Sequence, residues 1–287
     1  MAGLGGRCSE TGMDRKAFQE QLARTGSYDT ASDGNPRSRC ERMLGWSDGY
    51  YYWRIFRVVY SGHCYSKRGQ FGVETWADHS YGIHRAVEAC GGRIIIDGMD
   101  LVAALGVRPV VYVGNHMSLL ETLLIPVMAL QFNYLATVVK ESLVKYPIFG
   151  TVMRAVEPVT VSRRNPREDL KMVLEKGKEF LGAGRSVLIF PQSTRSRTID
   201  PADFNSLGAK LAQRSNVPLV PVAVKTDFHG IGRWARDVGR IDRKKALHFR
   251  FGAPMDVEGN GREAHRKTVD FITGALAEWG CQVETEQ

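Results

Sequence analysis

Short apolar runs alternate with longer stretches of helical periodicity over most of the chain. The runs are rich in β-branched residues and end at glycine, proline or polar residues, which predicts buried strands at residues 93–96, 109–113, 134–139, 158–161, 186–190, 217–224 and 247–251. Between them, apolar residues at helical spacing predict helices at residues 119–130, 165–182, 203–214 and 262–279. Strands that alternate with helices predict an α/β fold, with a mixed, largely parallel central sheet flanked by helices.

The first 92 residues differ from this pattern. Residues 1–45 are rich in Gly, Ser, Arg, Asp and Asn and show little apolar periodicity, so we expect a flexible N-terminal extension. Aromatic residues become frequent shortly after residue 46, and no linker or repeat is evident beyond it. We therefore expect one domain over residues 46–287, in which residues 46–92 form a helical, membrane-proximal part.

The first predicted helix of that part has an aromatic face. Trp53, Phe56 and Tyr60 share one side of a helix, while Arg54 and Arg57 lie elsewhere on it. Such a face can rest in a lipid interface. It can also belong to an ordinary packed helix with arginine stems along its flank, and the sequence leaves both interpretations open.

One uncharged stretch, residues 122–139, reaches the length at which a membrane span is considered. Pro126, Gln131 and Asn133 interrupt it. The pattern indicates a buried helix, a turn and then a strand over residues 134–139, so we do not expect a transmembrane segment.

Composition narrows the class of partner and the compartment. The 39 basic and 31 acidic residues give a formal net charge of +8, which favours an anionic partner such as nucleic acid, a membrane surface or a phosphorylated ligand. The five cysteines are scattered and form no C-x-x-C pair, which indicates neither a disulfide framework nor a zinc site. No apolar signal-peptide region is evident near the first residues, so we expect a cytoplasmic protein in a reducing compartment.

The stretch 114–121 places a histidine and a carboxylate between a predicted strand and a predicted helix. On one continuous helix, His116 and Glu121 would lie about 140° apart, so they can meet only if the chain turns between them. A strand that ends near His116 and a helix that begins near Ser118 supply that turn, and the pair would suit a general base held by an orienting acid. Ser118 and Glu121 also have the spacing of a helix capping box, and a lone loop histidine is often structural, so both interpretations stay open.

Two further polar loops follow predicted strands. They carry Arg163 and Arg195, and in an open α/β sheet the loops at the carboxyl ends of the strands converge on the ligand. We therefore expect these arginines and His116 to share one site, where the arginines could hold a phosphate. Taken singly, each arginine could equally be a solvated surface group.

Four motifs follow one another in order along the chain. They are Asn115-His116-x4-Glu121, Arg163 with Asn165, Phe190-Pro191-Gln192-Ser193-Thr194-Arg195-Ser196, and Val217-Pro218-x-x-Pro221-Val222. A lysine block, Lys140-Glu141-Ser142-Leu143, lies between the first two. This ordered set, which covers about residues 90–225, resembles the four blocks of glycerolipid acyltransferases of the lysophosphatidic acid acyltransferase type.

The resemblance implies an O-acyltransferase that transfers a fatty acyl chain from a thioester to the free hydroxyl of a lysophospholipid resembling 1-acylglycerol-3-phosphate. It implies that His116 is the general base, that Glu121 orients the imidazole and stabilises its charged form, and that Arg163 and Arg195 hold the acceptor phosphate. The remaining substrate-binding residues that it implies are Lys140, Gln192, Ser193 and Thr194.

The resemblance also implies partners. The acyl donor would be acyl-CoA or acyl carrier protein, acting as co-substrate, with no metal and no other cofactor. The protein would associate peripherally with anionic lipid on the cytoplasmic side of the cell membrane, and no nucleic acid is expected.

Two positions depart from the usual family pattern. Glu121 replaces the usual aspartate, as it does in acyltransferases that act on lipid A, and Gln192-Ser193 replaces Glu-Gly in the third block. The acceptor could therefore be another lysolipid, such as a lyso-ornithine lipid or a lipid A precursor. Two classes outside acyl transfer also remain: a serine hydrolase using Ser118 or Ser193, although neither lies in a G-x-S-x-G elbow, and a non-catalytic protein that binds anionic lipid.

Overall fold

The structure is a computed structural model, and it describes residues 12–192, 194–232 and 237–284. Within these residues eight strands form one sheet in the order β1-β2-β8-β7-β3-β6-β4-β5. The pairs β1–β2 and β7–β8 are antiparallel and all other neighbours are parallel, which confirms a mixed, largely parallel sheet. The strands are β1 Tyr28–Asp29, β2 Ile94–Asp97, β3 Val111–Gly114, β4 Leu135–Lys140, β5 Val159–Val161, β6 Ser186–Ile189, β7 Leu219–Lys225 and β8 Leu247–Phe251.

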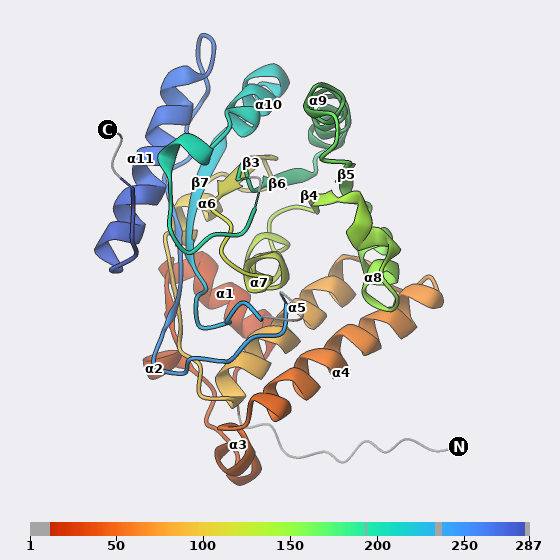
Figure 1. Cartoon of the computed structure of the whole chain (residues 1–287), viewed down its shortest axis with the longest axis vertical. Helices are drawn as coiled ribbons and strands as arrows, with labels where there is room; N and C mark the ends of the chain where they lie inside the picture. Colours follow the sequence, from red (N-terminus) through yellow and green to blue (C-terminus); the bar gives the residue numbers. More distant parts are fainter. Residues whose placement is uncertain (1–11, 193, 233–236, 285–287) are drawn as a thin grey trace.

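Helices cover both faces of the sheet (Figure 1). On one face lie α9, α10 and α11, and on the other lie α1, α5 and α7, with α4 packed outside α5 and against α8. The helices are α1 Arg15–Thr25, α2 Thr30–Asp33, α3 Arg39–Leu44, α4 Asp48–Lys67, α5 Val73–Ala89, α6 Met99–Ala103, α7 Leu120–Ala129, α8 Phe149–Ala155, α9 Pro166–Gly182, α10 Leu207–Ser215 and α11 Arg262–Glu278, with 3-10 turns η1 Glu141–Lys145 and η2 Pro201–Asp203.

The central strands are apolar along their whole length because both of their faces are covered. Successive side chains on a strand point to opposite faces. On β3, Val111 and Val113 pack into the core cluster that contains α9 and α10, whereas Tyr112 packs into the cluster that contains α7. The same alternation holds on β4 and β6, so each strand contributes to both cores.

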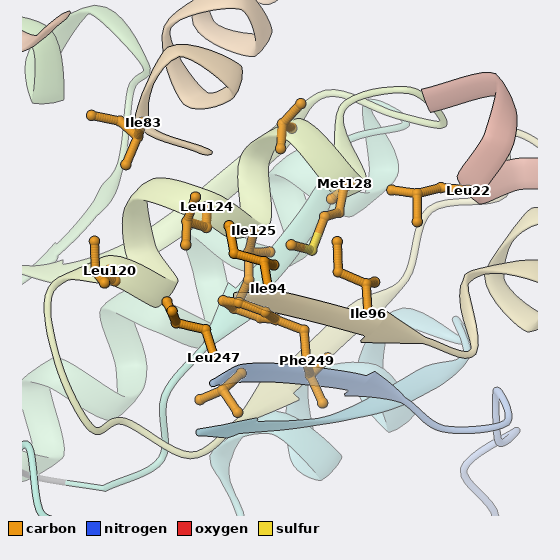
Figure 2. Close-up of a cluster of buried hydrophobic side chains, with 14 of the residues drawn as sticks. Leu22, Ile83, Ile94, Ile96, Leu120, Leu124, Ile125, Met128, Leu247 and Phe249 are labelled. Atoms are coloured by element: carbon orange, nitrogen blue, oxygen red, sulfur yellow. The ribbon is translucent and has the colours of Figure 1, made fainter. Parts of the chain in front are cut away.

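The larger core lies on the α7 side of the sheet (Figure 2). Helix α7 lies across the antiparallel end of the sheet, and side chains of α1 and α5 close the core from the outer side. The side chains labelled in this view are all buried: Leu22, Ile83, Ile94, Ile96, Leu120, Leu124, Ile125, Met128, Leu247 and Phe249.

The expectation of a flexible extension over residues 1–45 was wrong for residues 12–45, which contain α1, β1, α2 and α3. Phe18, Leu22 and Tyr28 are buried in the larger core. The segment carries few apolar residues, but those few share one surface, and many of its polar residues cap helices or hydrogen-bond to the body of the protein. Residues 1–11 lie outside the described residues.

The uncharged stretch folds as predicted, because α7 ends at Ala129 and β4 begins at Leu135. Residues 46–92 contain α4 and α5, as expected for the helical part. In the part of the chain that the structure describes, no helix is both long enough and apolar enough to cross a membrane.

Candidate active site

The carboxyl ends of β3, β6, β4 and β5 lie at the same edge of the sheet, because these strands are parallel neighbours. The loops that follow them bring His116, Gln192, Arg195, Lys140 and Arg163 to one cavity of about 710 Å³. The predicted convergence of the three polar loops is therefore confirmed.

The turn between β3 and α7 brings His116 and Glu121 together. The Nδ1 atom of His116 lies 2.8 Å from Oε1 of Glu121. Because the carboxylate accepts a hydrogen bond from Nδ1–H, the neutral imidazole carries its lone pair on Nε2. The ring also stacks on Phe190, with centroids 4.6 Å apart and planes 15° apart, so its orientation is fixed from two sides.

Glu121 holds the turn before α7 as well as the His116 ring, but the predicted capping box of Ser118 and Glu121 is wrong, because α7 begins at Leu120 with Leu119 as its N-cap and no side-chain cap. Its Oε1 accepts hydrogen bonds from the backbone N–H of Met117 at 2.6 Å and of Ser118 at 2.7 Å, so the carboxylate satisfies free donors before α7. The same oxygen holds the His116 ring. Its Oε2 accepts from Oγ1 of Thr226 at 2.7 Å and lies 3.0 Å from Oγ of Ser118. One carboxylate thus fixes both the turn and the orientation of the ring.

Glu121 is fully buried, yet the pKa of its carboxyl group lies below the ordinary value. Burial alone would raise the pKa of its carboxyl group, but the hydrogen bond and charge of His116, with the hydrogen bonds from Thr226 and Ser118, outweigh burial and lower the pKa. A buried carboxylate therefore lies beside the His116 ring.

Asn115 fixes the position of the turn. Its side chain is fully buried and forms two hydrogen bonds of 2.8 Å with the backbone of Val224 on β7, donating to the carbonyl and accepting from the N–H. This pairing continues the contact between β3 and β7 by one more position. His116 therefore follows a residue that is held as firmly as a strand.

The loop after β6 holds the backbone of His116 from its other side. Oε1 of Gln192 accepts from the His116 N–H at 2.7 Å, and the Ser196 N–H donates to the His116 carbonyl at 3.0 Å. Because the His116 N–H needs an acceptor, the Gln192 amide must present its oxygen there. Its Nε2 is then buried with no hydrogen-bond partner among the described residues.

The two arginines form the cationic part of the cavity. Desolvation by burial, and next the charge of Arg195, lower the pKa of Arg163, as expected for two nearby cations. Arg195 forms an ion pair with Asp237. Arg163 has a positive φ of 59°, and both oxygens of Asp169 accept backbone N–H groups, from Ser162 at 2.8 Å and Arg163 at 2.7 Å. Asp169 thus holds the strained loop that carries Arg163.

Of the other predicted substrate-binding residues, two line the cavity and one cannot be placed. Lys140 and Thr194 are exposed and line the same cavity. Ser193 lies outside the described residues. Ser118, which the hydrolase hypothesis used, is 3% exposed and is not part of the cavity wall.

The sequence analysis missed several residues at this site. Thr226 directly follows β7, so the rule that found the other strand-end loops could have found it too. In the sequence, Asp169 has the position of an ordinary acidic residue in the first turn of a helix, so its contact with the Arg163 loop was not predicted. Asp237 and Lys210 also line the cavity, and no local signal in the sequence marks either residue.

Comparisons with known proteins agree with this geometry. The family model named Acyltransferase matches residues 93–225, the span from β2 to the end of β7 that carries the His116, Arg163 and Arg195 loops. The match covers somewhat less than half of the chain. It ends at Lys225, so Asp237 and β8 lie beyond it.

Several proteins similar to this chain carry the name 1-acyl-sn-glycerol-3-phosphate acyltransferase. The relative from Pseudomonas aeruginosa is 28% identical over 215 residues, which cover 74% of this chain and 79% of the relative. The relative from Cocos nucifera is 28% identical over 182 residues, and the match covers 63% of this chain but only 56% of that protein.

A solved structure has the same fold as this chain. It is the crystal structure of the 1-acyl-sn-glycerophosphate (LPA) acyltransferase from Thermotoga maritima, with a TM-score of 0.54 and 20% sequence identity. The match covers 86% of this chain and 99% of the other. The shared architecture therefore extends beyond the matched family span into the flanking elements.

Proposed function

We propose that this protein moves a fatty acyl group from a thioester donor to the free hydroxyl of an acceptor of the lysophosphatidic acid type, with His116 as general base. One observation carries the proposal: an imidazole held by a buried carboxylate shares a cavity with two arginines. The first feature suits activation of a hydroxyl, and the second suits a phosphate. The names of the relatives support the same acceptor class.

The proposed step uses both His116 and Glu121. Nε2 of His116 takes the proton of the acceptor hydroxyl as that oxygen attacks the thioester carbonyl carbon. Glu121 stabilises the imidazolium that forms, because its charge lies 2.8 Å from Nδ1. The carbon–sulfur bond then breaks, and the departing sulfur receives the proton from His116. The products are the acylated acceptor and a free thiol, and His116 is neutral again.

The arginines would bind the acceptor phosphate by charge-assisted hydrogen bonds. Arg195 already has an anionic partner, Asp237, so the phosphate would take the place of that carboxylate. Lys140 and Thr194 line the same cavity and would contact the headgroup from the β4 and β6 loops.

A second cavity of about 430 Å³ would hold an acyl chain. It lies between α4, α7 and α8, and its walls are almost entirely apolar. It shares wall residues with the main cavity, so a chain that starts beside His116 can continue into it. The shared residues are Leu119, Leu143, Tyr146, Phe149 and Asp237.

Helix α4 would place this cavity against lipid. Trp53, Phe56 and Tyr60 are about half exposed on its outer side, and the guanidinium of Arg57 lies 4.8 Å from the centre of the Trp53 ring. Aromatic rings flanked by cations suit the interface of a membrane that contains anionic lipid. Phe56 also lines the apolar cavity, so one helix would face both the membrane and the acyl chain. We accordingly place the protein peripherally on the cytoplasmic side of the cell membrane.

Turnover with defined substrates tests the proposal. Purified protein is incubated with vesicles that contain lysophosphatidic acid and with either acyl-CoA or acyl carrier protein as donor. We expect phosphatidic acid as product, and a loss of turnover by about 10²- to 10⁴-fold in His116→Ala. Circular dichroism shows whether that variant remains folded. A wild-type rate in folded His116→Ala would exclude the proposed base.

The acceptor class is tested in the same assay. Lyso-ornithine lipid and a lysolipid without a phosphate monoester replace lysophosphatidic acid in separate vesicles. If the arginines bind a phosphate monoester, kcat/KM is highest for lysophosphatidic acid. A clear preference for lyso-ornithine lipid would leave acyl transfer in place and replace the acceptor.

The hydrolase alternative has less support than acyl transfer. The hydroxyl of Ser118 accepts from the Leu120 N–H at 3.0 Å and lies 2.9 Å from Oγ1 of Thr226 and 3.0 Å from Glu121. It is therefore engaged in the buried network and does not face the cavity. A serine-reactive phosphonate should leave the protein unlabelled at Ser118.

A further inference from the structure

The main cavity has two branches, one on each face of the sheet. Val138 and Val139 are consecutive on β4, so their side chains point to opposite faces. Val138 packs against the core of α9 and α10, whereas Val139 packs against Met153 of α8. Both valines line the cavity. The cavity therefore wraps around the carboxyl edge of β4 and β6, with His116 at the bend.

We call the branch between α9 and α10 the α9–α10 groove. Figure 1 shows these two helices on the opposite side of the sheet from α7. Leu170 and Val173 of α9 and Leu207 of α10 form its walls, and Ile189 of β6 forms its floor with Val138. Lys210 of α10 also lines the cavity. The groove thus joins an apolar interior to a cationic rim.

Lys210 is exposed and forms no ion pair with a carboxylate of the described residues. Asp169 also lines the cavity, and its carboxylate accepts the N–H groups of Ser162 and Arg163 instead of pairing with Lys210. An anionic group that enters the groove would therefore meet a free ammonium group.

We propose that the α9–α10 groove binds the phosphopantetheine arm of the thioester donor, with Lys210 facing its phosphate. This inference rests on the proposed acyl transfer. The other branch continues into the apolar cavity under α4, which suits the acyl chain. The thioester must lie beside His116, at the bend, so the rest of the donor leaves through the remaining branch. A methyl-bearing amide chain that ends in a phosphate matches apolar walls with a cation at the rim.

Coenzyme A and acyl carrier protein both carry this arm, so the experiment uses both donors. Lys210→Ala is expected to raise KM for acyl-CoA by about 3- to 5-fold, because it removes the attraction between the ammonium group and the phosphate. Lys210→Glu is expected to raise it by about 10-fold, because a carboxylate repels the phosphate. KM for the lysolipid stays unchanged in both variants. The matched control is Arg214→Glu, one turn further along α10, outside the cavity wall. It leaves both KM values unchanged.

A truncated donor separates the phosphate from the rest of the arm. Acyl-pantetheine has the same chain and thioester but no phosphate. With this donor, Lys210→Glu and the wild type should give the same KM. A persistent difference would mean that Lys210 does not act on the phosphate, and it would overturn the role given to this residue.

Leu170→Trp tests whether the arm occupies the groove at all. Leu170 is partly exposed on the groove wall, so tryptophan can narrow the groove without disturbing a buried site. KM should rise for acyl-CoA, acyl carrier protein and acyl-pantetheine alike. Met172→Trp is the control, because Met172 is exposed on the same helix but is not part of the cavity wall.

Direct binding separates this inference from the proposed function. Titration calorimetry with coenzyme A itself requires no turnover, and Lys210→Glu should weaken binding by about 10-fold. If no lysolipid is acylated while this binding and its dependence on Lys210 persist, the proposed function fails and the donor groove stands. If turnover proceeds while Lys210→Glu and Leu170→Trp leave every donor KM unchanged, the groove inference is overturned. An effect seen only with acyl carrier protein would also overturn it, because it would assign Lys210 and Leu170 to contacts with the carrier protein instead of with the shared arm.

Discussion

The proposed base and the proposed phosphate site share one cavity but are held in different ways. His116 is fixed by a fully buried carboxylate, by a stacked ring and by hydrogen bonds to both its backbone N–H and its carbonyl. Arg163 and Arg195 instead extend from loops, and Arg195 pairs with Asp237, itself on the cavity wall. A base must keep one geometry through the reaction, whereas a phosphate site must exchange partners when substrate enters. Substitutions at the first site should therefore change kcat, and those at the second should change KM.

The largest effect in this comparison is expected from Glu121→Gln. The amide keeps the shape and can still accept the backbone N–H groups, but the charge that stabilises the imidazolium is lost. We expect kcat to fall by about 10²- to 10³-fold with little change in KM for the acceptor. Steady-state kinetics on lysophosphatidic acid vesicles measures both. A variant in which only KM changed would remove the distinction between the two sites.

Arg195→Ala is expected to show the opposite pattern. Loss of a charge-assisted hydrogen bond to phosphate should raise KM for the acceptor by roughly 10-fold, from about 1.5 kcal/mol, while kcat changes little. Arg197→Ala is the matched control, because this exposed arginine lies two residues further along the loop and outside the cavity wall. A fall in kcat alone for Arg195→Ala would assign this arginine to the reaction step instead of to recognition.

The buried carboxylate also predicts a dependence of stability on acid. The hydrogen bonds to His116, Thr226 and Ser118 keep the folded pKa of Glu121 below its ordinary value of 4.5, despite burial. The stability that such a group contributes is fully present above pH 4.5. It is lost as the pH falls through the lower pKa of the folded state. The melting temperature of the wild type should therefore fall more steeply below pH 4.5 than that of Glu121→Gln. Equal slopes in thermal denaturation would mean that this carboxylate is not stabilised by folding.

The sequence predicted those parts of the fold and site that depend on local pattern. The apolar runs identified the central strands, and Asn165 was correctly predicted as the cap of α9, since its side chain accepts from the N–H of Arg167. The turn between β3 and α7 followed from geometry alone, because His116 and Glu121 could meet in no other way. The convergence of the three loops followed from the parallel strands.

The rest depended on contacts between distant segments. Residues 12–45 carry too few apolar residues for a local signal, and they fold because Phe18 and Leu22 pack into a core that other elements build. Thr226 and Asp237 reach the site from beyond β7, far along the chain from the residues that they contact. The pattern of residues within one segment of the sequence gives no information about contacts with distant segments. The supporting parts of the site were therefore harder to predict than the base.

The smallest effect is expected from Thr226, which tests how much of the rigidity at the base comes from a single distant contact. Thr226→Val keeps the volume but removes the hydrogen bond to Oε2 of Glu121, so one side of the carboxylate loses a donor. We expect kcat to fall by about 3- to 10-fold, from roughly 1 kcal/mol, and KM for the acceptor to stay unchanged. Thr226→Ser restores the hydroxyl and should restore kcat. If Thr226→Val keeps kcat while Thr226→Ser loses it, the methyl group and its packing matter at this position, and the hydrogen bond does not. A rescue by serine would show that the geometry of the base extends through Glu121 to a residue at the end of β7.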